Sequence, residues 1–88
     1  MRELFLDPIP AAALESLRAV SPRVAQGLEE CLDWIEADPP DVRAKRRRFT
    51  NGMWAIVREI DGSAWVVLWD EEVPGEPTVR HIGETASL

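Results

Sequence analysis

Met53–Trp69 reads MWAIVREIDGSAWVVLW, two apolar runs joined by Asp61-Gly62. Apolar residues recur in both runs with a period of two, which indicates β-strands. An Asp-Gly link of two residues between such runs is a strong signal for a β-hairpin, because glycine adopts a positive φ without steric cost. The stretch therefore predicts two antiparallel strands over residues 53–60 and 63–69, with a register that is fixed by the turn.

This register divides the side chains of the hairpin between two faces of the sheet. One face carries large apolar residues around Arg58: Trp54, Ile56, Trp65, Val67 and Trp69. The other, which we call the open face, carries Ala55, Val57, Val66 and Leu68. Large aromatic residues bury the most area, so we expect the tryptophan face to form the core. The open face is then an exposed apolar patch that binds a partner protein or a second copy, unless the C-terminal tail or the first helix covers it.

Two helices are predicted before the hairpin. The first spans about residues 10–20 and has proline at its start, where helices tolerate it best. The second follows Ser21-Pro22 and carries apolar residues at helical spacing from Val24 to Ile35. It ends at the proline pair 39–40, because proline lacks the backbone donor that a helix needs. Only about two residues join the helices, so we expect them to form an antiparallel hairpin.

Short strands are predicted near both ends of the chain. Residues 2–7 (RELFLD) indicate a strand that joins the edge of the sheet, and residues 78–82 (TVRHI) indicate a last strand. Between the hairpin and this last strand, residues 70–77 (DEEVPGEP) are expected to form an acidic loop. The sequence therefore predicts a single α+β domain over residues 1–88. Its two layers are an antiparallel sheet and a helical hairpin, in the order β-α-α-β-β-β.

Charge is distributed unevenly along a chain whose net charge is −6. Residues 1–42 carry a net charge of −6, residues 43–60 carry +5 and residues 61–88 carry −5. General electrostatic binding to DNA or RNA needs a broad positive surface, and the two acidic flanks argue against one. The basic segment is more typical of a local contact with one partner.

Several kinds of chemistry lack the residues that they require. Cys31 and His81 are the one cysteine and the one histidine, and they do not form a zinc motif. Cys31 lies among Leu28, Leu32 and Ile35 at helical spacing, so we expect a buried thiol rather than a nucleophile. The sequence has no glycine-rich phosphate loop, membrane-spanning stretch or signal peptide. We therefore expect a cytoplasmic protein without a metal or a cofactor.

The order and spacing of these elements resemble a known family. Two short helices end in a DPP-type break, and a basic run, the strands GMWAIVREIDGSAWVVLW and the last strand TVRHIG follow. From Leu4 to Gly83 this pattern resembles the RelE/ParE toxins of bacterial type II toxin–antitoxin systems. The resemblance implies a concave sheet face opposite the helices and an antitoxin that wraps the toxin. In RelE-like members the concave face binds messenger RNA at the ribosome and promotes its cleavage, whereas ParE-like members act on DNA gyrase.

The resemblance also indicates where a catalytic site would lie. Ribosome-dependent members carry basic residues at the positions that align with Ala55, Val57 and Val66, so groups that would stabilise a pentacoordinate phosphate are missing here. His81 could act as a general acid or base, although a lone histidine on a strand is more often structural. The remaining candidates for catalysis are Arg46, Arg48, Arg80 and His81.

The basic run Lys45–Arg48 has two interpretations. In the first, its side chains contact phosphate, and strand alternation places Arg46 and Arg48 on the same side. In the second, the run is solvated and neutralises the nine acidic residues of residues 1–42. Arg58, on the tryptophan face, is expected to stack on an aromatic ring or to pair with an acidic residue of a helix.

Three functional hypotheses result. The first is a RelE/ParE-like toxin-fold protein of a toxin–antitoxin module that acts through macromolecular contacts and lacks the full ribonuclease site. Its open face would bind the antitoxin. The second is an active ribosome-dependent toxin that cleaves messenger RNA. The third is a non-toxic interaction module that forms a homodimer through the open face.

Overall fold

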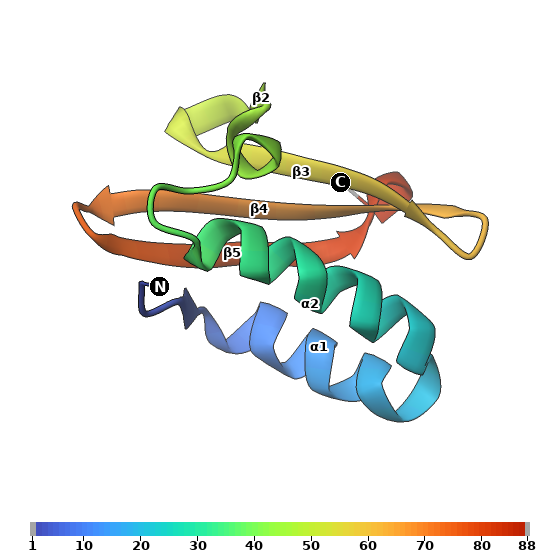
Figure 1. Ribbon diagram of the computed structural model, residues 1–88. Helices are drawn as coiled ribbons and strands as arrows, with labels where there is room; N and C mark the ends of the chain where they lie inside the picture. Colours follow the sequence, from blue (N-terminus) through green and yellow to red (C-terminus); the bar gives the residue numbers. More distant parts are fainter. Residues whose placement is uncertain (1, 88) are drawn as a thin grey trace.

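A computed structural model describes residues 2–87, which form the α+β fold that the sequence predicts. The strands are β1 (Phe5–Leu6), β2 (Arg47–Arg48), β3 (Trp54–Ile60), β4 (Ser63–Val73) and β5 (Glu76–Glu84). The α-helices are α1 (Pro8–Val20) and α2 (Pro22–Glu36), and short 3-10 turns occur at η1 (Val42–Lys45), η2 (Thr50–Gly52) and η3 (Thr85–Ser87). The strands form one sheet in the order β1-β5-β4-β3-β2 (Figure 1).

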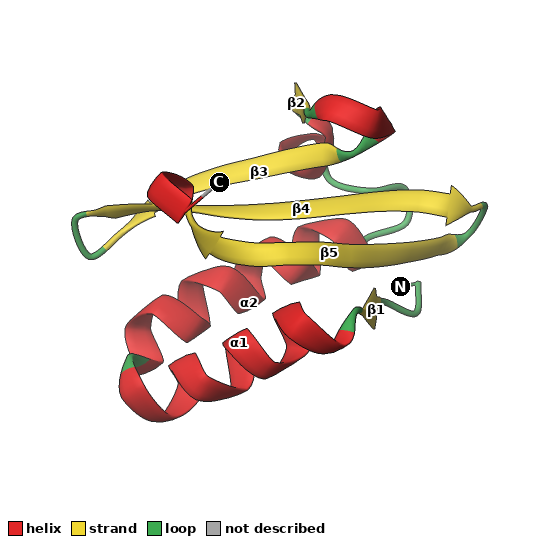
Figure 2. Cartoon of the chain, turned by 180° about the vertical axis from the view of Figure 1, so that it is seen from behind, coloured by secondary structure: helices red, strands yellow, loops and turns green. Residues whose placement is uncertain are grey.

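Both helices lie on one side of the sheet, as Figure 1 and Figure 2 show from opposite directions. α1 begins two residues earlier than predicted, because the Asp7 carbonyl already accepts a hydrogen bond from Ala11 N at 3.0 Å. The predicted apolar stripe of α2 is confirmed, since all of its members are buried: Val24, Leu28, Cys31, Leu32 and Ile35. No helix among residues 2–87 has the length and apolar character needed to cross a lipid bilayer.

The core lies between the helices and the tryptophan face of the sheet. Trp69 is completely buried, and its Nε1–H donates to the carbonyl of Ala44 at 2.8 Å. This hydrogen bond satisfies the polar atom of the indole and fixes η1 against the sheet. Cys31 is buried as predicted, and burial raises the pKa of its thiol.

The predicted register of the β3–β4 hairpin is confirmed. Trp54 pairs with Trp69, and Ile60 pairs with Ser63 on either side of the turn. The turn residues Asp61 and Gly62 have φ angles of 50° and 82°, the positive values that a tight hairpin turn requires. Side chains of the tryptophan face form or contact the core: Trp54, Ile56, Trp65, Val67 and Trp69.

The predicted acidic loop over residues 70–77 is wrong, because most of this segment belongs to strands. β4 continues to Val73 and β5 begins at Glu76, so the second hairpin is longer than the first. Two register shifts interrupt the pairing, between Leu68 and Trp69 and between Asp70 and Val73. Such bulges let a strand continue through residues that do not follow the period-two pattern.

The prediction that all strands are antiparallel is wrong at the β1 edge, and at the opposite edge the structure has one strand more than predicted. β1 joins the edge as predicted, but it runs parallel to β5, with Phe5 opposite Thr78 and Leu6 opposite Val79. β2 was not predicted, and it adds a pair of residues antiparallel to β3. Side-chain periodicity contains no information about strand direction, and a strand of two residues is too short to show a period.

The open face is less exposed than predicted. Ala55, Val66 and Leu68 have exposed fractions of only 6%, 1% and 4%, whereas Val57 is 43% exposed. Met53 packs against the three buried residues, and η3 lies against β4 at one end of the sheet (Figure 2). The prediction of an exposed apolar patch is therefore wrong for three of its four residues.

Candidate binding cleft

Most of the outer edge of β3 has no neighbouring strand. β2 pairs only with the first two residues of β3, through Arg48 opposite Trp54 and Arg47 opposite Ala55. Within residues 2–87, the segment Ile56–Ile60 has no strand on this side. An uncovered strand edge presents unpaired backbone donors and acceptors to any chain that approaches it.

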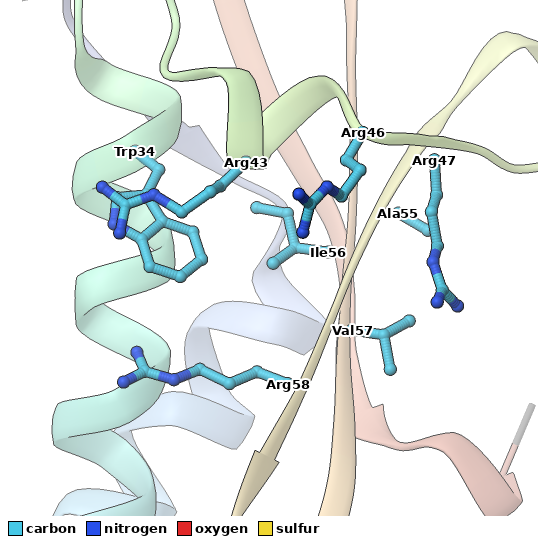
Figure 3. Close-up of a pocket in the computed structure, with 8 residues that line it drawn as sticks. All are labelled: Trp34, Arg43, Arg46, Arg47, Ala55, Ile56, Val57 and Arg58. Atoms are coloured by element: carbon cyan, nitrogen blue, oxygen red, sulfur yellow. The ribbon is translucent and has the colours of Figure 1, made fainter.

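A cleft of about 170 Å³ lies beside this edge (Figure 3). Its lining, which defines what we call the arginine cleft, consists of Trp34, Ala55, Ile56, Val57 and the four arginines Arg43, Arg46, Arg47 and Arg58. In Figure 3 the side chains of Arg46 and Ile56 lie on one side of β3, and those of Arg47 and Val57 lie on the other. The cleft therefore extends around the strand edge onto both faces of the sheet.

Trp34 of α2 lies at one side of the cleft and contacts two of its arginines. The guanidinium of Arg43 lies 4.2 Å from the centroid of the indole ring, and that of Arg58 lies 5.4 Å from it. Asp41 holds Arg43 by accepting hydrogen bonds from Nε and Nη2, each at 2.9 Å. Hydrogen bonding from Arg43 lowers the pKa of Asp41 to about 2. The carboxylate is thus ionised at neutral pH, and Arg43 keeps its partner.

Arg58 has the structural role that the sequence predicts. Its Nη1 donates to Glu30 Oε2 at 2.9 Å and to the carbonyl of Gly27 at 3.0 Å, so it connects β3 to α2. α2 also passes close to the end of β3, where a Cβ added at Gly27 would lie 2.7 Å from Ile60 Cδ1. The absence of a side chain at Gly27 therefore helps α2 to form one wall of the cleft.

Arg46 and Arg47 differ from the other two arginines of the cleft. Both are exposed, and neither forms an ion pair or a side-chain hydrogen bond within residues 2–87. Two hydrogen bonds nevertheless hold the turn η1 that precedes them. Asp41 caps η1 by accepting from the backbone N–H of Arg43, and the carbonyl of Ala44 accepts from Trp69 Nε1. The fold holds these two charges in place without supplying acidic partners for them.

Two of the four catalytic candidates lie in another groove. Arg48 and Arg80 contribute to a cavity of about 590 Å³ that also involves η2 and β4. Arg48 donates to the carbonyl of Gly52 at 2.9 Å and lies 4.1 Å from the ring centroid of Trp54. Arg80 forms ion pairs with three acidic side chains: Asp7, Asp70 and Glu72. Both guanidinium groups therefore already have partners within the domain.

The remaining candidates lie elsewhere. His81 pairs with Leu68 in the sheet register, and its Nε2 is buried without a hydrogen-bond partner in the described part of the chain. It lines neither the arginine cleft nor the groove of Arg48. Of the four catalytic candidates, only Arg46 lines the arginine cleft. The structure thus distributes the candidates over three places, and a shared catalytic role stays a prediction.

Sequence reasoning did not find the arginine cleft, although part of the signal was present. The expected alternation places Arg46 and Arg47 on opposite sides, as Figure 3 shows, but it does not reveal that one cleft extends around the edge of β3 and includes both. Asp41 and Arg43, two positions apart, were the local sign of a capped turn that places an arginine beside α2.

Comparisons with known proteins found no relative of this chain. No family model matches it, and no curated protein or solved structure is significantly similar to it. In the part of the chain that the structure describes, no group of three or more His, Cys, Asp or Glu side chains is arranged to hold a metal ion. The functional argument therefore depends on the geometry and charge of the arginine cleft.

Proposed function

We propose that this chain is a RelE/ParE-like toxin-fold protein of a toxin–antitoxin module, and that it acts by binding a macromolecule through the arginine cleft. The observation that carries the proposal is the pair Arg46 and Arg47, two charges of an acidic protein that have no acidic partner among residues 2–87. Clustered like charges repel one another and do not stabilise the fold. They attract and orient a partner of opposite charge.

The architecture supports the family assignment in this proposal. α1 and α2 form a helical hairpin on one face of the sheet, and β3, β4 and β5 follow as consecutive antiparallel strands. This layout agrees with the layers that the family resemblance implies. The same resemblance suggests the classes of macromolecule to test: an antitoxin, messenger RNA at the ribosome, and DNA gyrase.

The proposed action is binding rather than RNA cleavage. Cleavage requires an acid, a base and cationic groups that converge on one phosphate. Here Arg80 is held by carboxylates, Arg48 is stacked on Trp54, and His81 does not line the groove that these two arginines share. The strand positions that would complete such a site carry Ala55 and Val66, which are apolar and buried.

The toxin proposal is tested by inducing the chain in bacteria, with and without the gene that neighbours it in its source genome. We expect growth to stop with the chain alone and to continue when the neighbouring product is present. The double substitution Arg46→Glu and Arg47→Glu should remove the growth arrest while leaving the thermal unfolding transition nearly unchanged. Arg23→Glu is the matched control, because the side chain of Arg23 is 82% exposed and lies outside the cleft.

Growth that continues normally during induction of the wild-type chain would contradict a toxin role. Cleavage of messenger RNA on translating ribosomes, abolished by Arg46→Ala or His81→Ala, would instead support the RNA-cleaving alternative. A concentration-dependent dimer that Val57→Lys disrupts would support the interaction module, because Val57 is the exposed residue of the open face.

A further inference from the structure

The outer edge of β3 offers backbone hydrogen bonds in addition to charge. In a hairpin with a two-residue turn, the residues that flank the turn form a hydrogen-bonded pair, and bonded and non-bonded pairs then alternate. From the observed register, the N–H and C=O groups of Val57 and Glu59 point away from β4. β2 pairs no further along β3 than Ala55, so these outward groups have no strand partner within residues 2–87.

We propose that an extended acidic segment of a partner protein binds here as an additional strand, next to β3. Main-chain hydrogen bonds would supply part of the affinity, and the arginines would select the charge of the segment. This inference deepens the proposed function and rests on it, since it names the class of partner for the same cleft.

The arrangement of the arginines fits a strand better than a compact ligand. Side chains of an added strand point alternately to the two faces of the sheet. On the helix side they would meet Arg46, with Arg43 and Arg58 beside it. On the other side they would meet Arg47 and the exposed apolar side chain of Val57. A segment with carboxylates and apolar residues in alternation complements both sides.

A second copy of this chain is a poorer occupant than an acidic segment. Pairing two β3 edges would place the arginine cleft of one copy against that of the other. Arg46 and Arg47 have no acidic partner within residues 2–87, so their charges would face like charges across such an interface. Like-charge juxtaposition at an interface is unfavourable and disfavours the wrong partner.

A nucleic acid is also a poorer occupant. Binding of single strands normally uses exposed aromatic rings on which bases stack. Arg43 and Arg58 lie over Trp34, and Arg48 lies over Trp54, so arginines already occupy the ring faces nearest the cleft. Phosphates would also leave the outward backbone groups of Val57 and Glu59 unused.

The test uses the full chain, labelled with ¹⁵N, and a short capped peptide of alternating valine and glutamate. Addition of the peptide should shift the amide signals of Val57 and Glu59 and slow their hydrogen exchange. A peptide of the same sequence that is N-methylated at every second residue has the same charge but lacks donors along one edge. We expect it to bind at least about tenfold more weakly, and a valine–lysine peptide not to bind.

Substitutions in the cleft separate the role of the arginines from that of the backbone. Arg46→Gln with Arg47→Gln should weaken peptide binding about tenfold, and added salt should reduce the difference by screening charge. Val57→Pro should also weaken binding, because proline removes one outward donor. If Val57→Pro fails to fold, the N-methylated peptide gives the same information. Arg23→Gln is the control that should leave binding unchanged.

Several outcomes would overturn the inference. Equal binding of the N-methylated peptide would show that no strand is added, and signal shifts confined to another surface would show that the site is wrong. Tighter binding of oligouridylate RNA that displaces the peptide would assign the cleft to nucleic acid. A dimer in sedimentation that buries the Val57 and Glu59 amides would assign it to a second copy. Growth arrest without peptide binding would overturn the inference alone, whereas peptide binding without growth arrest would overturn the toxin role alone.

Discussion

Each edge of the sheet is paired with a strand of only two residues, and the two edges differ in how their arginines are partnered. At one edge, β1 pairs with β5, and the nearby Arg80 forms ion pairs with three acidic side chains. At the other, β2 covers only the first two residues of β3, and Arg46 and Arg47 have no acidic partner within residues 2–87. At the first edge the arginine is paired within the fold, whereas the second edge presents outward backbone groups and positive charge without an acidic partner among residues 2–87.

This difference shows that the neighbours of an arginine decide what it can do. Arg80 was a catalytic candidate on the basis of sequence, yet its ion pairs fix it within the fold. Arg58 and Arg43 likewise have carboxylate partners, Glu30 and Asp41. The arginines that remain available for a partner are those for which the fold supplies no carboxylate. The predictions below test this contrast, beginning with the largest expected effect.

Trp69→Ala should remove contacts that hold both edges of the sheet, and it should have the largest effect on stability. Trp69 pairs with Val79 of β5 and, through Ala44, holds the turn that precedes Arg46 and Arg47. Removal of a completely buried tryptophan should lower the free energy of unfolding by about 3–5 kcal/mol, measured by chemical denaturation.

Trp54→Ala provides the control for this substitution. Trp54 is only partly buried, so the loss should be clearly smaller. Equal losses for the two variants would show that Trp69 does not have the central position described here.

Val66→Lys should be the next most damaging change, and Val57→Lys should be mild. Val66 is 1% exposed, so a lysine there would bury an unpaired charge and destabilise the domain by about 3 kcal/mol. Val57 is 43% exposed and lies at the open edge, where a lysine remains in water. Thermal unfolding of the two variants distinguishes them, and a reversed order would mean that the cover of the open face is not as described.

The hairpin at the centre of the sheet was predictable because its signals are local. A two-residue Asp-Gly turn and a period-two pattern are enough to fix the register of Trp54 with Trp69. The second hairpin was not predictable, because its charged residues lack that period. Its pairing depends on bulges and on distant contacts such as the ion pair between Arg2 and Glu71, which no local pattern reveals.

The candidate site was predictable only in part. The partners of Arg58 followed from its place on the tryptophan face, beside an acidic helix. The arginine cleft required tertiary packing, since the Trp69–Ala44 hydrogen bond joins residues 25 positions apart in sequence. The exposure of the edge was equally hidden, because the length of β2 depends on where η1 ends.

Arg80→Ala should remove the cation that the acidic side chains at the β1–β5 edge share. The substitution leaves Asp70, whose side chain is largely buried, and Asp7 without their shared cation. We expect the free energy of unfolding to fall by about 1–2 kcal/mol, measured by urea denaturation. Arg80→Lys should recover only part of this loss, because lysine cannot reproduce the several hydrogen bonds of a guanidinium group. No change in stability would mean that this edge is not held by the arginine.

Acid should weaken the ion pair between Arg2 and Glu71. Hydrogen bonding from Arg2 lowers the pKa of Glu71 from its ordinary value of 4.5. A carboxylate whose pKa is lower in the folded state stabilises the fold above its unfolded pKa, and this contribution disappears as the pH falls through the folded pKa. We expect stability to decrease below about pH 4.5, by less than in Arg80→Ala. The decrease should be smaller in Arg2→Ala, and an identical pH profile for both proteins would contradict the assignment.

Arg46→Gln with Arg47→Gln should have the smallest effect on stability. Neither arginine has an acidic partner within residues 2–87, so the free energy of unfolding should change by less than about 0.5 kcal/mol. Reduced repulsion from Arg43 and Arg58 would make any change a slight gain at low salt. If the run instead neutralised the acidic residues of residues 1–42, the variant would melt at a lower temperature at low salt. That difference would shrink as salt screens the charges. Thermal unfolding at two salt concentrations separates these outcomes, because only the second gives a salt-dependent loss.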